Sequence, residues 1–189
     1  METMANTHDL AAALANSDLL LDRATLEQAI ARMARDIDAD YTSDDVPVYL
    51  TVMHGGLPFA AQLAMELGAL GQDLEFDYLH ATRYRGETSG GELVWKHRPA
   101  TKLQGRRVLL ADDILDEGHT LKAVRDACLD MGAARVLLAV LCTKLHGRRA
   151  EGIEADFSGV DLPDRYVFGY GMDYHEQARN LPAIYALKD

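Results

Sequence analysis

The stretch Val108-Leu-Leu-Ala-Asp-Asp-Ile-Leu-Asp-Glu-Gly-His-Thr-Leu121 decides the fold class of this chain. It begins in an apolar run, Arg107–Ala111, of the kind that forms a strand buried on both faces of a parallel sheet. The acid pair Asp112 and Asp113 follows at the carboxyl end of this run, and a short turn over 116–120 then opens a helix. Open α/β sheets bind their ligands at the carboxyl ends of their strands. We therefore expect a ligand site at this turn.

The rest of the chain repeats the alternation of strands and helices. Apolar residues at helical spacing predict a helix over 22–39, another from Pro58 that stops at Gly68, and a third over 121–131 that Gly132 caps. Short apolar runs predict strands over 46–53, 74–81 and 135–142, and 92–96 is expected to return beside 74–81 as a hairpin. The pattern predicts an α/β fold with a central, mainly parallel sheet flanked by helices, in one domain covering residues 1–189.

Composition excludes several classes of protein. Nineteen Lys and Arg against thirty Asp and Glu give a formal charge of −11, which argues against a general nucleic-acid binder. Cys128 and Cys142 lie in apolar runs without metal-ligand spacing, so we expect two buried thiols. The apolar stretch 10–21 is interrupted by polar residues and follows no basic segment. We expect no signal peptide and no membrane span, hence a cytoplasmic protein.

The turn after the acid pair has the chemistry of a phosphate site. Backbone N–H groups and the helix dipole together attract anions at such a turn, Gly118 allows close approach, and the Thr120 hydroxyl can also donate. Two adjacent carboxylates are costly to hold together unless they bind a cation or a polyol. The alternative is an acidic loop with a helix cap, which strand-end acids alone would favour.

The same stretch resembles the phosphoribosyl-pyrophosphate (PRPP) signature of the type I phosphoribosyltransferases. Lys144 and the segment 163–181 (PDRYVFGYGMDYHEQARNL) narrow the resemblance to the hypoxanthine-guanine branch. It implies transfer of a phosphoribosyl group from PRPP to a 6-oxopurine with Mg²⁺ as cofactor. It also implies the type I fold, with a flexible lid hairpin and a small C-terminal hood built from the N-terminal helix region and about 150–189.

The resemblance assigns the acid pair and the turn to PRPP. Asp112 and Asp113 would hold the ribose hydroxyls, directly and through Mg²⁺. Asp116 would be the catalytic group, a proton acceptor near purine N7. A carboxylate there would also stabilise the positive charge that develops on the ribose. The residues of the turn that would bind the 5′-phosphate are Asp116, Glu117, Gly118, His119 and Thr120.

The base pocket is assigned in the same way. Lys144 would donate a hydrogen bond to the 6-oxo group of the purine. This donor would make the site prefer hypoxanthine and guanine over adenine. Tyr166 would stack on the purine, and Val167 would offer backbone groups to its edge. Asp173, beside the base, would coordinate a second Mg²⁺, and Arg179 would contact pyrophosphate. Read without the resemblance, Lys144 is an ordinary strand-end lysine and Arg179 a solvated charge.

Three positions, His54, Arg83 and Glu117, depart from the residues usual in the family. Gly55 and Gly56 would form a second anion loop, but His54 stands where the family usually has a lysine, next to a strained peptide bond whose amide contacts pyrophosphate. Arg83 and Tyr84 would belong to the lid, where most members have Ser-Tyr. Glu117 replaces a small hydroxyl residue, so its carboxylate must point away from the phosphate or be compensated.

Two rival functions remain open on the sequence. One is an enzyme of the same superfamily for another base, xanthine or adenine, although Lys144 with Tyr166-Val167 speaks against adenine. The other is a regulatory RNA-binding protein that keeps the PRPP fold, which would need a basic face. The expected partners are PRPP and a 6-oxopurine, without nucleic acid or membrane. A homodimer or homotetramer is expected from the family.

Overall fold

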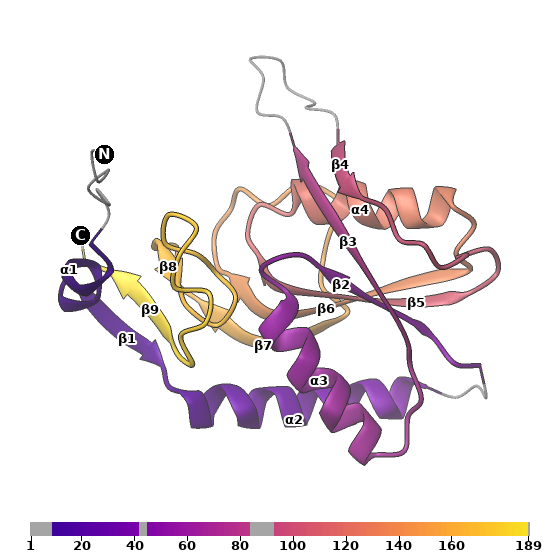
Figure 1. Cartoon of the computed structure of the whole chain (residues 1–189), viewed down its shortest axis with the longest axis horizontal. Helices are drawn as coiled ribbons and strands as arrows, with labels where there is room; N and C mark the ends of the chain where they lie inside the picture. The colour runs from indigo at the N-terminus through magenta and orange to yellow at the C-terminus, as the bar shows by residue number, and fades with distance from the viewer. Residues whose placement is uncertain (1–8, 42–44, 84–92, 189) are drawn as a thin grey trace, which may run out of the picture.

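A computed structural model describes residues 9–41, 45–83 and 93–188, in which a larger sheet is covered by helices and a smaller sheet lies beside it with one short helix (Figure 1). The helices are α1 (Leu10–Ala15), α2 (Arg23–Asp40), α3 (Leu57–Ala69) and α4 (His119–Asp130). The strands are β1 (Ser17–Leu21), β2 (Val48–Val52), β3 (Glu75–Arg83), β4 (Leu93–His97), β5 (Arg107–Leu115), β6 (Arg135–Lys144), β7 (Phe157–Leu162), β8 (Val167–Phe168) and β9 (Ile184–Leu187).

The larger sheet has the strand order β4-β3-β2-β5-β6-β7, and every pairing in it is parallel except β3 with β4. Helices α2 and α3 cover one face and α4 covers the other (Figure 1). The residues predicted to form the buried stripe of α2, Leu26, Ile30, Met33 and Ile37, are all buried. The predicted α/β fold with a mainly parallel sheet is confirmed.

The centre of this sheet is a topological switch point. The chain leaves β2 through α3 toward β3, whereas it leaves β5 through α4 toward β6 on the opposite side. Neighbouring strands whose connections diverge in this way leave a crevice at their carboxyl ends, where α/β proteins bind ligands. The loop after β2 and the end of β5 therefore face one crevice.

The smaller sheet forms a hood beside the carboxyl ends of the parallel strands (Figure 1). Its order is β1-β9-β8, and β1 pairs with β9 from Ser17 opposite Leu187 to Leu21 opposite Ile184. The resemblance implied a hood of the N-terminal region and about 150–189. Within that range β7 belongs to the larger sheet, and the hood sheet takes only β1, β8 and β9.

Several predicted boundaries were wrong. Strand β5 does not end at Ala111 but continues to Leu115, because it stays paired with β6 as far as Leu115 opposite Thr143. Helix α3 runs through Gly68 to Ala69, and the left-handed residue that ends this region is Gly71, with φ +94°. Strand β6 does not end at Cys142 as predicted but continues to Lys144.

Two other predictions, the hairpin and the buried thiols, were confirmed. Strands β3 and β4 pair antiparallel, as expected for the hairpin. Cys128 and Cys142 are free and buried. Over the described ranges, no helix combines the length and the apolar character needed to cross a bilayer.

Candidate active site

Asp112 and Asp113 lie side by side near the end of β5, in the crevice. Asp113 is only 8 % exposed, and its backbone N–H donates to Asp112 Oδ1 at 2.9 Å. Burial raises the pKa of Asp112 well above its usual value, and the neighbouring charge of Asp113 raises it further. Burial also raises the pKa of Asp113, while the positive charge of Arg179 counteracts the rise at both. The site therefore favours a cation or hydroxyl donors next to this pair.

Three backbone segments meet at Asp113. A Cβ on Gly55 would lie 2.1 Å from Asp113 Oδ2, so only glycine lets the loop after β2 approach the carboxylate. A Cβ on Gly171 would lie 2.1 Å from the Gly55 carbonyl oxygen and 3.2 Å from Asp113 Cβ. Gly56 packs as closely against the backbones of β2 and β5, because its Cβ would lie 2.7 Å from Val52 O and 2.8 Å from Ala111 O. The hood, the Gly55 loop and β5 thus form one closely packed wall of the crevice.

The predicted phosphate turn has an open helix N-terminus. Gly118 has φ +78°, and a Cβ there would lie 2.7 Å from Ile153 Cγ2, so both its conformation and its packing require glycine. Its cap residue, Gly118, has no side chain to bond the first turn of α4, which leaves N–H groups there for an anion. Glu117 is exposed, and its carboxylate lies 3.8 Å from Arg148 Nε, a contact that compensates its charge in part.

Asp116 binds two cationic or potentially cationic side chains from the end of β6. Lys144 Nζ donates to Asp116 Oδ2 at 2.7 Å, and His146 Nε2 lies 2.6 Å from Asp116 Oδ1. Burial by itself would raise the pKa of Asp116, but the hydrogen bonds from Lys144 and His146 lower it overall. His146 was not predicted as a site residue from the sequence. The available signal was its spacing of two residues from Lys144, because such residues point to the same side of an extended segment.

The hood supplies the predicted residues of the base pocket. Tyr166 is 49 % exposed, with its hydroxyl donating to Asp173 O at 3.2 Å, so one side of its ring can receive a ligand. Leu187 N donates to Tyr166 O, and residues of a strand alternate in the direction of their backbone groups. The N–H and C=O of Val167 therefore face away from β9, toward the open edge of the hood sheet.

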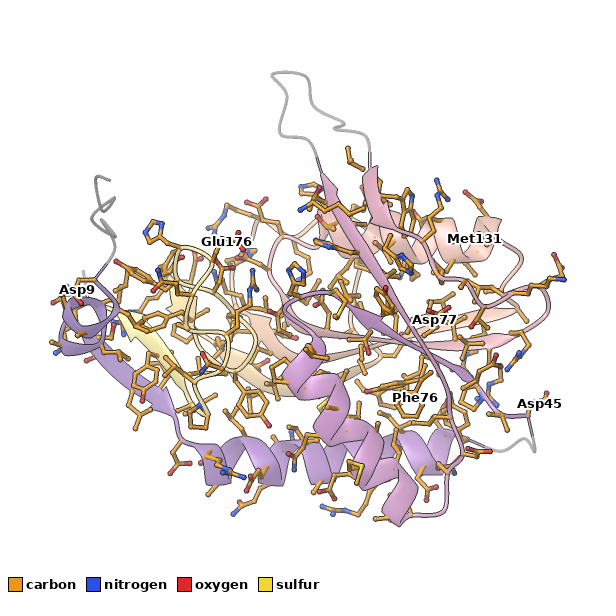
Figure 2. The ribbon with its side chains drawn as sticks, viewed as in Figure 1. Asp9, Asp45, Phe76, Asp77, Met131 and Glu176 are labelled. Carbon is orange, nitrogen blue, oxygen red and sulfur yellow. The ribbon has the colours of Figure 1, made fainter. Side chains whose placement is uncertain are left out.

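Arg179 ties the hood loop together. It donates from Nη1 to Gly171 O at 2.8 Å, and its Nη2 lies 2.8 Å from Asp173 Oδ1. Asp173 Oδ2 accepts from Glu176 N at 3.0 Å, so both oxygens of this carboxylate are occupied. Glu176, labelled in Figure 2, marks this loop between the hood sheet and the β3–β4 hairpin. A metal at Asp173 would therefore have to displace the guanidinium of Arg179.

His54, next to the Gly55 loop, lies beside a second histidine, His80 of β3. The Met53–His54 peptide is cis, at the place where the resemblance implied an unusual peptide bond. The rings of His54 and His80 are 4.5 Å apart, edge to face. Burial lowers the pKa of His80, and the charges of Lys96, His54 and Arg179 lower it further. The positive charges of Lys96 on β4 and Arg179 of the hood thus act near the Gly55 loop, which suits a polyanion.

The predicted residues lie at or just after the carboxyl ends of β2, β5 and β6, in the first turn of α4 and in the hood segment. Arg83 ends β3, and Tyr84 lies outside the described residues. Thr120 and His119 form the first turn of α4. No cluster of three or more potential metal-ligating side chains occurs within 9–41, 45–83 and 93–188. The acid pair still suits Mg²⁺, since this ion takes one or two carboxylates and completes its shell with water and substrate phosphates.

Comparisons with known proteins agree with this site. The family model for phosphoribosyl transferase domains matches residues 16–176. A hypoxanthine-guanine phosphoribosyltransferase of Streptococcus pneumoniae (strain ATCC BAA-255 / R6) is 34% identical over 172 residues, 90% of this chain and 93% of the relative. One of Bacillus subtilis (strain 168) is 36% identical over 166 residues, 86% of this chain and 90% of the relative.

Solved structures show the same likeness. A hypoxanthine phosphoribosyltransferase of Staphylococcus aureus superposes with a TM-score of 0.85 at 27% identity, covering 96% of this chain and 97% of the other. A hypoxanthine-guanine-xanthine phosphoribosyltransferase superposes with a TM-score of 0.79 at 28% identity, covering 91% and 97%. Because the family model matches most of the chain and both relatives are more than 30% identical over nearly their whole length, this chain belongs to the phosphoribosyltransferases.

Proposed function

We propose that this chain transfers the 5-phosphoribosyl group of PRPP to hypoxanthine or guanine, giving IMP or GMP and pyrophosphate. The observation that carries this proposal is the Lys144–Asp116 ion pair at 2.7 Å, between the phosphate turn and the hood. The pair would offer a 6-oxopurine both an ammonium donor and a carboxylate acceptor. The names of the S. pneumoniae and B. subtilis relatives support the same activity.

In this reaction purine N9 forms a bond to C1′ of the ribose, and pyrophosphate leaves with the electron pair of the C1′–O bond. The proton on N7 passes to the carboxylate of Asp116, which also stabilises the positive charge on the ribose. The open first turn of α4 binds the 5′-phosphate. The Gly55 loop and Arg179 face the leaving pyrophosphate.

The hood and Lys144 select the base. Lys144 has three N–H donors and uses one on Asp116, so it can donate another to the 6-oxo group. An exocyclic amine in that place would set donor against donor, which disfavours adenine. Tyr166 offers an exposed ring for stacking, and Val167 offers backbone groups along the open edge of the hood.

Mg²⁺ is part of this proposal. Asp112 and Asp113 would hold it, and when bound it neutralises charge on the pyrophosphate group of PRPP. The raised pKa values of this buried acid pair support the assignment, because a divalent cation would offset the cost of ionising both carboxylates.

The activity is tested by following absorbance with PRPP and, in turn, hypoxanthine, guanine, xanthine and adenine. We expect turnover with hypoxanthine or guanine in Mg²⁺, little with adenine, and loss of turnover with EDTA that added Mg²⁺ restores. A clear preference for xanthine would replace the base assignment. Binding of RNA on filters without any transfer would replace the enzymatic function by a regulatory one.

The expected homodimer or homotetramer is also a proposal. Apolar side chains on the outer strands of the larger sheet support it: Phe76 is 64 % exposed, Tyr78 44 % and Val94 46 %. Figure 2 labels Phe76 on β3. Light scattering should give two or four times the chain mass of 20.8 kDa, whereas a monomer at micromolar concentration would contradict the proposal.

A further inference from the structure

His146 stands behind the carboxylate of Asp116, on the side away from the solvent. Its side chain is 2% exposed and that of Lys144 12%, whereas the side chain of Asp116 is 42% exposed. The carboxylate therefore opens to the crevice while its two partners hold it from within. Breaking either contact would leave the buried side chain of Lys144 or His146 with an unpaired charge or an unsatisfied hydrogen-bond donor.

The hydrogen bonds of His146 define where its proton resides. Arg148 N donates to His146 Nδ1 at 3.0 Å, so Nδ1 carries a lone pair. The remaining ring proton is then on Nε2, which donates to Asp116 Oδ1 at 2.6 Å. A doubly protonated ring would point Nδ1–H at the N–H of Arg148. The geometry thus selects a neutral imidazole that acts as a donor to Asp116.

The two partners of Asp116, Lys144 and His146, have different roles in the proposed reaction. Under the proposed function Lys144 also serves the 6-oxo group of the purine, so its hold on Asp116 is shared once the base is bound. His146 is held by the backbone N–H of Arg148 and is not assigned to the base. Of the two partners, His146 is therefore the one whose bond to Asp116 base binding would leave unchanged.

We propose that His146 is the positioning residue for Asp116: it fixes the carboxylate by a hydrogen bond from Nε2 to Oδ1, so that an Asp116 oxygen meets the N7 proton while Lys144 engages the base. This inference rests on the proposed function and adds to it a residue outside the motifs that carry the family resemblance. His146 does not touch the substrate and acts only through Asp116.

The test compares His146→Phe, which keeps the ring shape without a donor, with His146→Gln, which keeps an N–H near the position of Nε2. We expect His146→Phe to lower kcat about 10- to 100-fold, as removal of an orienting partner commonly does, with little change in KM for PRPP. His146→Gln should recover most of this loss. The matched control is His97→Phe, a histidine of β4 stacked on Tyr78, which should leave kcat unchanged.

A pH profile separates positioning from simple structural support. The bond from His146 lowers the pKa of Asp116, so His146→Phe should raise that pKa and move the acidic limb of kcat/KM to higher pH. His146→Gln should leave the limb in place. Equal profiles for the two variants, or a His146→Phe enzyme that matches the wild type in kcat and limb, would overturn the proposal.

A measurement on the unmodified protein completes the test if a variant fails to fold. ¹⁵N NMR of imidazole-labelled protein at neutral pH should show His146 as the neutral ring protonated on Nε2, and a ring protonated on Nδ1 or on both nitrogens overturns the proposal. Transfer activity of the wild type decides the proposed function separately. An inactive wild type with the Nε2–H tautomer would end the proposed function, and an active wild type with unaffected variants would end only the role of His146.

Discussion

Substitution of Gly171 by alanine tests whether the hood positions the Gly55 loop. A Cβ on Gly171 would lie 2.1 Å from the Gly55 carbonyl oxygen, so the two backbones must separate by about 1.3 Å to reach the ordinary contact distance of 3.4 Å. The φ of +104° adds strain, of the order of 1–2 kcal/mol for a residue with a side chain. Both effects act on the loop that touches the Asp113 carboxylate.

A displacement of about 1 Å near reacting groups can cost on the order of 100-fold in rate. We therefore expect Gly171→Ala to lower kcat/KM for PRPP about 10- to 100-fold. Its strain should also lower the melting temperature by about 2–8 °C, since about 1–2 kcal/mol corresponds to that range in a chain of this size.

The control is Gly68→Ala in α3, where a Cβ would meet nothing within 4 Å. Alanine is favoured over glycine inside a helix by about 0.8–1.0 kcal/mol, so Gly68→Ala should raise the melting temperature slightly and leave kcat/KM unchanged. Steady-state kinetics with varied PRPP and thermal melts of the three proteins provide the comparison. If Gly171→Ala keeps the kcat/KM of the wild type, the hood does not position the Gly55 loop and this reasoning is refuted.

The remaining predictions concern acids and thiols. Asp116→Asn should lower kcat at least about 10-fold in initial-rate assays, while PRPP binding measured by calorimetry should stay largely intact. The control is Asp126→Asn, at an exposed position of α4, which should match the wild type in kcat and in PRPP binding. Because burial raises the pKa of Asp113, the folded state gains stability from its protonation below the unfolded pKa and loses it as pH rises through the folded pKa. Without Mg²⁺, Asp113→Asn should therefore melt higher than the wild type at pH 7–8, and the gap should close near pH 4; a gap independent of pH would contradict this. Burial raises the pKa of Cys128 to about 11 and raises the pKa of Cys142 as well. A thiol reagent should therefore label the folded protein at pH 7.5 far more slowly than the protein in denaturant. Equal labelling rates would count against the burial of both thiols.

Much of the fold could be predicted because its signals are local. The unit of strand, acid pair, glycine turn and helix spans residues 107–131 and needs no distant partner to be recognised. Helix α2 was found from its apolar spacing, since burial of one face dictates that period. The end of β5 was misplaced because pairing with β6 keeps the acidic residues extended, which their composition alone does not indicate.

The sequence by itself determined the chemistry that this chain offers: an acid pair, a glycine turn, a lysine at a strand end and an aromatic hood segment. Only the tertiary structure decided which of these groups meet. His146 faces Asp116 across a separation of 30 residues, and Gly171 packs on Gly55 from the far end of the chain. Such contacts depend on the order of the strands and on the pairing of β1 with β9, which close the hood over the crevice. The periodicity of apolar residues indicates which face of a helix or strand is buried. Which other element packs against that face depends on the packing of the whole chain.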